Sequence, residues 1–271
     1  AELDDAADGV AVRAVVVSGA GRAFSAGADV TEFLEGRTVP RDVYEAASGF
    51  AGPVVAKVDG HCLGGGLEIA LACDRRVARS DVEAGSPEVK LGLVPGLGGS
   101  YRLPRLIGST EAMKLILTGK SVDAKEGKKL GLFDDVTEQR HLKTAARAAL
   151  KEGKRERKGF EAWRDEAMDT KPARTLVARQ MRRKTAEKIN KAHYPAPFKL
   201  IEAFEDYGIS RDLLEEETDL FVELAATETS KNLRRVFALR EKMKHAAELS
   251  DEKLEISHVH VIGAGAMGGD I

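Results

Sequence analysis

Short apolar runs and segments with helical spacing follow one another along the first half of the chain, which is typical of an α/β protein. Val10 to Val17 and Val54 to Val58 are β-branched runs, and each is followed by a polar residue and a glycine. Such runs predict short buried strands that end in tight turns. The alternation of these strands with helical segments predicts a layered α/β fold over residues 10–136.

The apolar spacing then changes to that of helices. It predicts helices over residues 100–107, 109–118 and 123–130, and further helices after Pro197 and over residues 230–249. Asp123 followed by Glu126 resembles a capping pair, and Gly131 suits a left-handed C-cap. Residues 137–255 are therefore expected to be mostly helical.

Three glycines in succession lead into the helix-forming segment LEIALAC. The first N–H groups of a helix lack helical acceptors, and glycine lets a negative charge approach them closely, so Gly64, Gly65 and Gly66 predict an oxyanion hole. Glu68 lies in this apolar segment, and Glu88 follows 20 residues later in SPEVKLG. Two carboxyl groups beside an anion site favour the transfer of water or a proton next to a carbonyl.

Each of these features also has a purely structural interpretation. A glycine run is often only a tight turn, and a glutamate in a first helical turn often only complements the helix dipole. The combination gains weight from the earlier segment GRAFSAGADVTEF, residues 21–33, which follows the strand VRAVVVSG.

The segments AFSAGAD, HCLGGGLE and SPEVKLGLVPGLGG occur in an order and at a spacing that resemble the enoyl-CoA hydratase/isomerase (crotonase) superfamily. The likeness continues through LTGKSVDAKEGKKLGLFDDV to Val136. It implies a crotonase-type ββα spiral followed by a helical region. It also implies a CoA thioester as the substrate and no cofactor for hydration.

The resemblance also assigns roles to individual residues. The backbone N–H groups of Ala28 and Gly65 would hold the thioester oxygen as it becomes an enolate. Glu88 would donate a proton to C2, while Glu68 would orient and activate the water that attacks C3. Asp29 has a structural alternative as the N-cap of a helix from Val30. The resemblance implies a substrate site formed by Ala26, Ala28, Asp29, Gly65 and Gly96.

The helical region resembles the linker of multifunctional β-oxidation enzymes, which joins a hydratase to a 3-hydroxyacyl-CoA dehydrogenase. The predicted organisation is a crotonase core over 1–136, a helical linker over 137–255 and the start of an NAD-binding domain over 256–271. This last segment reads as the first strand of a truncated Rossmann domain that enters the fingerprint Gly263, Gly265 and Gly268.

The chain is expected to be a fragment, truncated at both ends, of such an enzyme. Dinucleotide binding needs a helix, a second strand and an acidic ribose ligand beyond the glycine fingerprint. We therefore expect negligible NAD binding by this chain and reserve NAD as a cofactor for a full-length parent. A thiolase subunit is the expected partner of that parent.

The composition narrows the function further. The net charge of −2 gives no general attraction to nucleic acid, and no apolar run reaches the length of a membrane span. Cys62 and Cys73 are expected to be reduced core residues, in keeping with a cytoplasmic protein. The six histidines form no pattern typical of a metal site or a catalytic triad.

Residues 151–191 carry 14 Lys or Arg against 7 Asp or Glu. This excess of positive charge predicts either a solvated helix face or a patch for CoA phosphates or a partner.

Three functions remain open at this point. The first is hydration of trans-2-enoyl-CoA to 3-hydroxyacyl-CoA in fatty-acid β-oxidation. The second is isomerisation between Δ3- and Δ2-enoyl-CoA or another crotonase-fold acyl-CoA reaction. The third is an inactive, truncated CoA-binding fragment.

Overall fold

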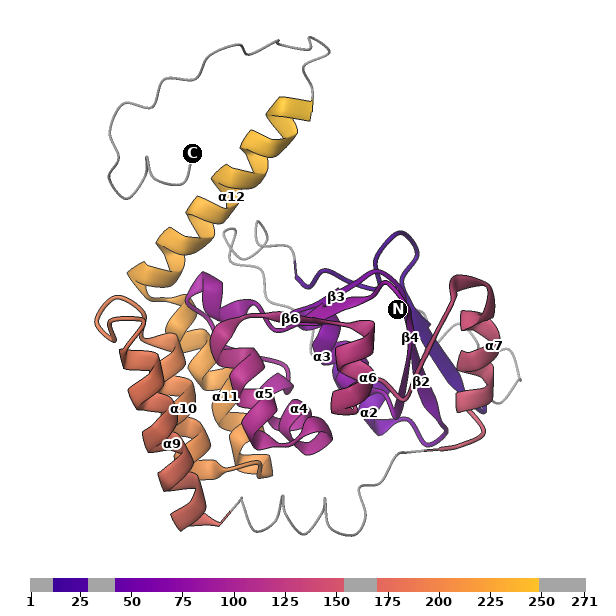
Figure 1. The fold of residues 1–271 in the computed structure, drawn as a ribbon, viewed down its shortest axis with the longest axis horizontal. Helices are drawn as coiled ribbons and strands as arrows, with labels where there is room; N and C mark the ends of the chain where they lie inside the picture. The colour runs from indigo at the N-terminus through magenta and orange to yellow at the C-terminus, as the bar shows by residue number, and fades with distance from the viewer. Residues whose placement is uncertain (1–11, 29–41, 154–169, 249–271) are drawn as a thin grey trace. The chain divides into compact units, whose positions relative to one another are not determined.

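The computed structural model describes residues 12–28, 42–153 and 170–248 (Figure 1). Two sheets lie in the first half of these residues. One sheet has the order β1-β2-β4-β7 with parallel neighbours throughout, and the other has the order β3-β5-β6. The strands are β1 (Val15–Ser18), β2 (Val54–Val58), β3 (His61–Leu63), β4 (Arg75–Arg79), β5 (Glu83–Gly85), β6 (Ser121–Asp123) and β7 (Asp135–Thr137).

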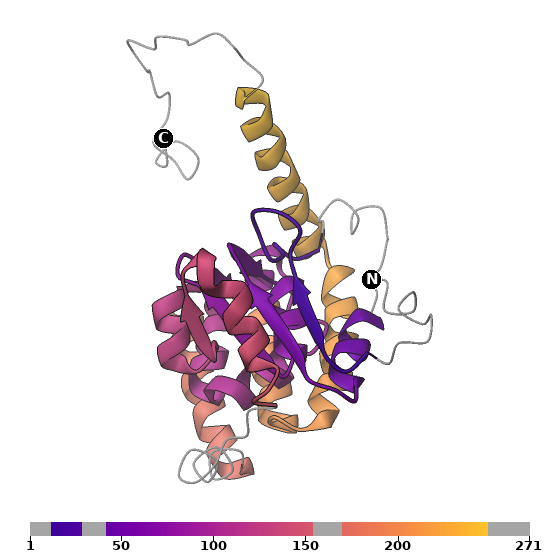
Figure 2. The same cartoon turned by 90° about the vertical axis from the view of Figure 1, so that its right-hand side faces the viewer.

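The chain passes repeatedly from the larger sheet to the smaller one and then into a helix. β2 is followed by β3 and helix α3 (Gly65–Ala72), and β4 is followed by β5 and the 3-10 helix η1 (Glu88–Leu91). Figure 2 shows β1 and β2, in indigo and purple, side by side. This arrangement confirms the predicted crotonase-like α/β fold over the part of the chain that the structure describes.

The turn between β2 and β3 shows why glycine is needed there. Gly60 has a positive φ of 67°, and a Cβ atom at this position would lie 2.0 Å from the carbonyl oxygen of Arg22. Only a residue without a side chain fits both constraints. The Asp-Gly turn therefore allows the loop after β1 to pack directly against the turn between the two sheets.

The remaining helices agree closely with the predicted spacing. Asp123 caps α6 by accepting a hydrogen bond from the N–H of Glu126 at 2.7 Å, as predicted. This agreement holds for α4, α5, α6, α10 and α12, whereas α2, α7, α9 and α11 were not individually predicted. The helices are α2 (Asp42–Gly49), α4 (Gly99–Ile107), α5 (Ser109–Thr118), α6 (Ala124–Leu130), α7 (Gln139–Ala149), α9 (Lys171–Ala186), α10 (Ala196–Tyr207), α11 (Arg211–Ala225) and α12 (Glu228–Glu248).

One hydrophobic core joins the sheets to the helices that follow them. The cluster that contains Val54 and Leu103 also contains Phe204 of α10 and Leu213 of α11. Helices α9, α10 and α11 lie side by side (Figure 1). The helical region therefore shares its core with the spiral, which places α11 close to the residues that follow η1.

The chain divides into two compact units, Ala1–Arg235 and Val236–Ile271. All the site residues discussed below belong to the first unit. The predicted boundaries at 136/137 and 255/256 stay predictions. The glycine fingerprint and its strand lie outside the described residues, as do Asp29 and the helix predicted from Val30.

Cys62 and Cys73 are free and buried, as expected of core thiols. Burial raises the pKa of both thiols, and that of Cys73 rises to about 12. Among the described helices, none has the length and apolar character that crossing a membrane requires.

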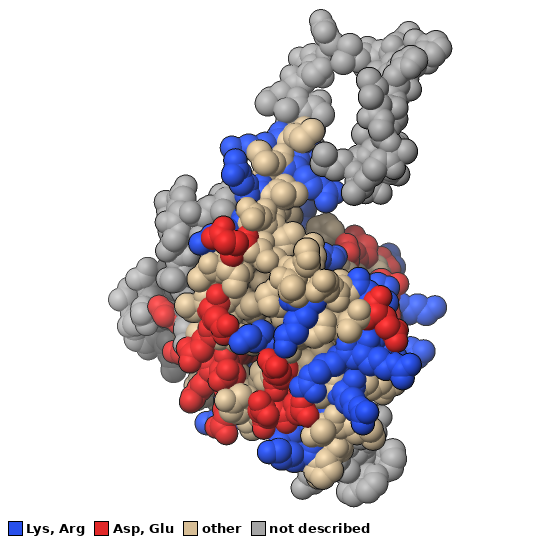
Figure 3. Space-filling view, turned by 90° about the vertical axis from the view of Figure 1, so that its left-hand side faces the viewer, with Lys and Arg blue, Asp and Glu red and all other residues tan. Residues whose placement is uncertain are grey.

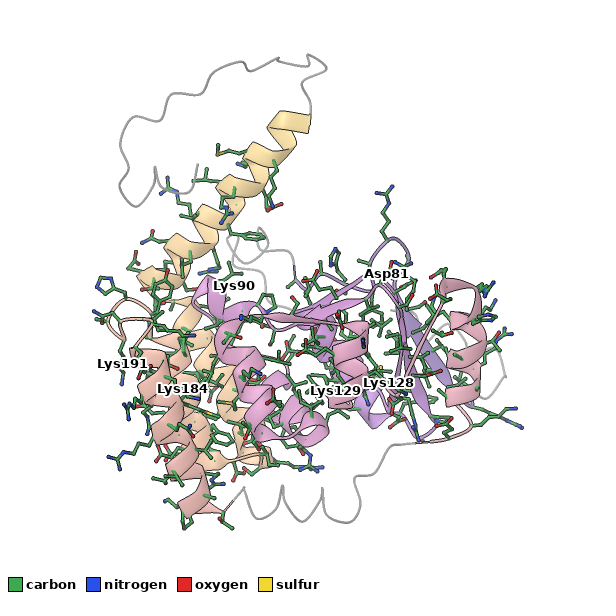
Figure 4. The ribbon with its side chains drawn as sticks, viewed as in Figure 1. Asp81, Lys90, Lys128, Lys129, Lys184 and Lys191 are labelled. Atoms are coloured by element: carbon green, nitrogen blue, oxygen red, sulfur yellow. The ribbon has the colours of Figure 1, made fainter. Side chains whose placement is uncertain are left out.

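The described part of the basic segment is largely solvent-exposed. Arg179, Arg183 and Lys184 on α9 are exposed, and Arg183 pairs with Glu187 on its own helix. Figure 4 shows Lys184 and Lys191 on the side of the molecule that α9 occupies, and Figure 3 views the molecule from that side, with basic and acidic side chains in neighbouring areas. Exposure is expected both of a solvated face and of a patch for CoA phosphates or a partner, so both interpretations stay predictions.

Candidate active site

The entrance of α3 packs tightly against the loop that follows β1. The helix begins at Gly65, so two of the three glycines lie inside it rather than before it. Gly64 adopts a φ of 53°, and a Cβ atom on Gly66 would lie 2.4 Å from the carbonyl oxygen of Ser25. The glycine run is therefore required by this close contact between two backbones.

This contact brings together the two residues predicted to form the oxyanion hole. The backbone nitrogen of Ala28 lies 3.8 Å from the position that a Cβ atom would take on Gly65. Gly65 is the first residue of α3, so its N–H has no acceptor within the helix. Two N–H groups at a glycine-lined helix entrance suit a developing oxyanion.

Glu68 lies in the first turn of α3 and is 3% exposed. Its Oε1 accepts hydrogen bonds from the backbone N–H groups of Leu97 and Gly99, both at 2.8 Å. Burial raises the pKa of Glu68, while these two N–H groups oppose the rise by stabilising the ionised form. The carboxyl group is thus held in one orientation by backbone donors.

Glu88 is the first residue of η1 and has a different environment. Its Oε2 accepts a hydrogen bond from the Ser86 hydroxyl at 2.8 Å. Its Oε1 is shielded from solvent, has no hydrogen-bond partner among the described residues and lies 3.3 Å from the Cβ position of Gly64. Burial, and secondly the negative charge of Glu68, raise the pKa of Glu88 to about 8. Glu88 is therefore a protonated acid at neutral pH.

Tyr44 also belongs to this site, although no sequence pattern predicted it. Its hydroxyl donates to the carbonyl oxygen of Gly65 at 3.2 Å. Burial and the charges of Glu68 and Glu88 raise the pKa of the phenol, so it stays protonated. The segment DVYEAASG matches no catalytic motif, and only the fold brings α2 to the entrance of α3.

A third buried carboxyl group, Glu217 of α11, was also missed. Its oxygens accept hydrogen bonds from the N–H groups of Gly98 at 2.7 Å and Ser100 at 2.8 Å. The signal that could have found it is a charged residue on an apolar stripe, because Glu217 shares one buried face of α11 with Leu213 and Leu220.

Two other residues of the predicted substrate site, Ala26 and Gly96, differ in their exposure to solvent. Ala26 is exposed on the loop that leads to Ala28. Gly96 is partly buried and packs against the ring of Phe221, 2.8 Å from its Cβ position. The described ranges contain no group of three or more His, Cys, Asp or Glu side chains placed to hold a metal ion.

The arrangement can stabilise an oxyanion, deliver a proton from one acid and accept a proton at another.

Comparison with known proteins agrees with this chemistry. The sequence model of the family described as "Enoyl-CoA hydratase/isomerase" matches residues 1–198.

Two curated relatives are similar over most of this chain. The fatty acid oxidation complex subunit alpha of Vibrio vulnificus (strain CMCP6) is 36% identical over 92% of the chain and 37% of its own length. The subunit alpha of Vibrio campbellii (strain ATCC BAA-1116) is 37% identical over the same two shares. The chain thus spans little more than a third of these relatives.

A solved structure supports the fold. The carnitinyl-CoA hydratase from Mycobacterium avium superimposes with a TM-score of 0.55 at 28% identity. The superposition covers 84% of this chain and 78% of that one.

Proposed function

Because the chain belongs to the enoyl-CoA hydratase/isomerase family, we propose that it hydrates trans-2-enoyl-CoA thioesters to 3-hydroxyacyl-CoA. The observation that carries this proposal is the contrast between two buried carboxyl groups near one pair of backbone N–H groups. Glu68 is oriented by two N–H donors, whereas Glu88 has a pKa of about 8 and an oxygen without a partner among the described residues. Addition of water needs one carboxyl group that accepts a proton from water and another that donates a proton to the substrate.

In the proposed reaction, ionised Glu68 takes a proton from water as the water oxygen bonds to C3 of the substrate. The C2=C3 electron pair moves toward the thioester, whose oxygen becomes an enolate held by the N–H groups of Ala28 and Gly65. Glu88 then donates its proton to C2, and the carbonyl re-forms. One water has been added, and the proton on Glu68 passes to Glu88, directly or by exchange of both acids with solvent, before the next turnover.

We further propose that the substrates are acyl-CoA intermediates of fatty-acid β-oxidation. The support is the likeness to subunits whose names include the fatty acid oxidation complex. An NAD-dependent dehydrogenase domain and a thiolase partner are proposals for a longer parent protein, and the cytoplasmic location stays a prediction.

Isomerisation of 3-enoyl-CoA is the second candidate, and the environment of Glu88 favours it. Glu88 has a pKa of about 8 and an oxygen without a partner among the described residues. In its ionised form such a carboxyl group is suited to removing a proton from one carbon and returning it to another. In that reaction Glu68 would only stabilise the loop, and no water would be added.

The test is to offer the purified chain crotonyl-CoA and a 3-enoyl-CoA separately. We expect loss of the conjugated enoyl-thioester absorbance with crotonyl-CoA and formation of 3-hydroxybutyryl-CoA, identified by mass. Formation of a 2-enoyl-CoA from the 3-enoyl substrate, without hydration of either, would establish the isomerase instead. Binding of both thioesters without turnover would identify an inactive CoA-binding fragment.

A further inference from the structure

One face of α11 covers the 96–100 loop, which carries the N–H groups bound to Glu68 and whose last two residues, Gly99 and Ser100, also begin α4. The Thr218 hydroxyl donates to the Gly96 carbonyl oxygen at 3.3 Å, and the Phe221 ring packs against Gly96. Leu214 lies against Gly98, with its Cδ1 3.1 Å from the Cβ position of that glycine. Residues 214, 217, 218 and 221 follow helical spacing, so one side of the helix makes all these contacts.

Within this loop, successive N–H groups are bound alternately by two carboxyl groups. Glu68 accepts from residues 97 and 99, and Glu217 accepts from residues 98 and 100. Glu217 is 1% exposed, and its partners lie 117 and 119 residues away in sequence. The loop is therefore held between one acid from the spiral and one from the helical region.

A side-chain hydrogen bond from Glu217 also lowers the pKa of Glu68, against the rise that burial causes. Two carboxylates have no donor between them, so this bond requires one proton on the pair. Two buried carboxyl groups in contact cannot both ionise at moderate cost, because each charge opposes the other. The pair therefore holds one proton and one negative charge.

The neighbouring groups place the charge on Glu68. The charged or titratable groups that act on the pair include Arg102 of α4, Glu88 of η1 and the Tyr44 phenol of α2. The Ser100 side chain acts on Glu217 and opposes the rise of its pKa. The attraction of Arg102 favours the ionised form of Glu68, whereas burial and the charge of Glu68 raise the pKa of Glu217 well above its usual value. Helix α10 adds buried apolar side chains to the surrounding core.

We propose that Glu217 is a positioning residue that acts through Glu68, as the protonated member of a carboxyl pair that fixes the 97–100 loop and keeps Glu68 ionised. The proposal rests on the hydratase function proposed above. It assigns the helical region a part in the chemistry, because α11 supplies a group on which the state of the proposed base depends.

The kinetic test compares Glu217→Leu, Glu217→Gln and the exposed matched control Glu215→Gln on the same helix. Leucine removes both the acceptors and the donor, so we expect kcat for crotonyl-CoA hydration to fall roughly 10–100-fold, with KM changed by less than about threefold. Without the hydrogen bond from Glu217, ionised Glu68 is less stable, so the acidic limb of the kcat/KM profile moves to higher pH. The glutamine side chain still donates to Glu68. In Glu217→Gln, kcat and the position of the acidic limb should therefore lie closer to the parental values than in Glu217→Leu.

An infrared measurement tests the proton without relying on activity. Protonated Glu88 contributes a carboxyl C=O band to the parent and to all these variants at neutral pH, so the test uses difference spectra, in which this contribution cancels. The parent-minus-variant spectrum should contain a protonated-carboxyl C=O band for both Glu217 variants and none for Glu215→Gln. Absence of this difference band from both Glu217 variants would overturn the proposal, as would a folded Glu217→Leu variant with parental kcat and an unmoved acidic limb. If the leucine variant does not fold, Glu217→Gln still decides the infrared result.

The two proposals fail in different ways. If the parent does not hydrate crotonyl-CoA, the proposed function is wrong, and the infrared band still decides whether Glu217 carries the shared proton. If the parent is active and the band is unaffected by substitution of Glu217, only the positioning role is wrong.

Discussion

The surroundings of Glu68 and Glu88 differ in the kind of group that holds each carboxyl. Backbone N–H groups bind Glu68, and these belong to a loop covered by α11. A single side-chain hydroxyl binds Glu88, whose second oxygen has no partner among the described residues. The first environment fixes the orientation of the Glu68 carboxyl group. The second leaves one oxygen of Glu88 available to exchange a proton.

This difference suggests how one site obtains a base and an acid from the same residue type. Fixed donors favour the ionised form of Glu68, while burial with few donors favours the protonated form of Glu88. The predictions below test this contrast, from the largest expected effect to the smallest.

The largest effect should follow removal of either carboxyl group. Glu68→Gln and Glu88→Gln keep the side-chain volume while removing the acid–base function, so we expect crotonyl-CoA hydration to fall by roughly 10²–10⁴-fold in each. Because the two groups act as a unit, the double variant should be little slower than the slower single variant. Steady-state kinetics of the three variants measure this.

Glu111→Gln is a matched control, because Glu111 is a partly exposed acid on α5 that pairs with nearby Lys114. It should keep parental activity. Near-parental hydration by Glu68→Gln combined with an inactive Glu88→Gln would contradict the two-acid mechanism and support isomerisation by a single acid.

The raised pKa of Glu88 should also appear in stability. Between the ordinary glutamate pKa of 4.5 and about 8, the folded protein holds a proton that the unfolded chain has lost. The free energy of unfolding therefore falls as pH rises through this window, by an amount on the order of a few kcal/mol. Urea denaturation from pH 5 to 8 should show a shallower fall for Glu88→Gln than for the parent, and equal slopes would refute the assignment.

A methyl group placed beside Glu68 should disturb the fixed environment directly. In Gly99→Ala the new Cβ would lie 2.7 Å from Pro95 Cβ and 3.0 Å from Glu68 Oε1. We expect a loss of about 1–3 kcal/mol in unfolding free energy from this overpacking, together with reduced hydration. Gly49→Ala is the control, because its Cβ would meet open space, and it should be unchanged or slightly more stable. Equal behaviour of the two variants would show that the loop adapts freely.

The smallest effect concerns Glu88, which accepts fewer hydrogen bonds than Glu68. Hydration needs protonated Glu88, so kcat/KM should decline as pH rises above about 8. The Ser86 hydroxyl stabilises the ionised form of Glu88 and lowers its pKa, so Ser86→Ala should move the basic limb to higher pH by about one unit or less. A shift to lower pH would mean that the hydroxyl stabilises the protonated form instead.

Local patterns were enough to predict much of the fold. The bounds of α5 were predicted to the residue, and the Asp123 cap was predicted from its spacing to Glu126. These features depend on neighbours within one turn, which the sequence displays directly. The start of α3 at Gly65 was less predictable, because the close contact between Gly66 and Ser25 comes from another segment.

The proposed site was predictable only where its residues lie in compact motifs. Glu68 and Glu88 lie in HCLGGGLE and SPEVKLG, whereas Tyr44 and Glu217 lie in ordinary amphipathic helices. In DLLEEETDLFVELA, nothing adjacent distinguishes Glu217 from exposed Glu215 except its place on the buried stripe. Their importance comes from packing between distant elements, which local periodicity does not reveal.

The separation of 117 to 119 residues between Glu217 and its partners also affects the order of events during synthesis. The strands of the spiral leave the ribosome long before α11 does, and at about 5–20 residues per second that interval lasts several seconds or more. Until then, the N–H groups of Gly98 and Ser100 lack the acceptor that they have in the finished protein. Because such distant contacts close late and slowly, a nascent chain should acquire acid–base competence only after α11 has been synthesised, later than the strands of the spiral.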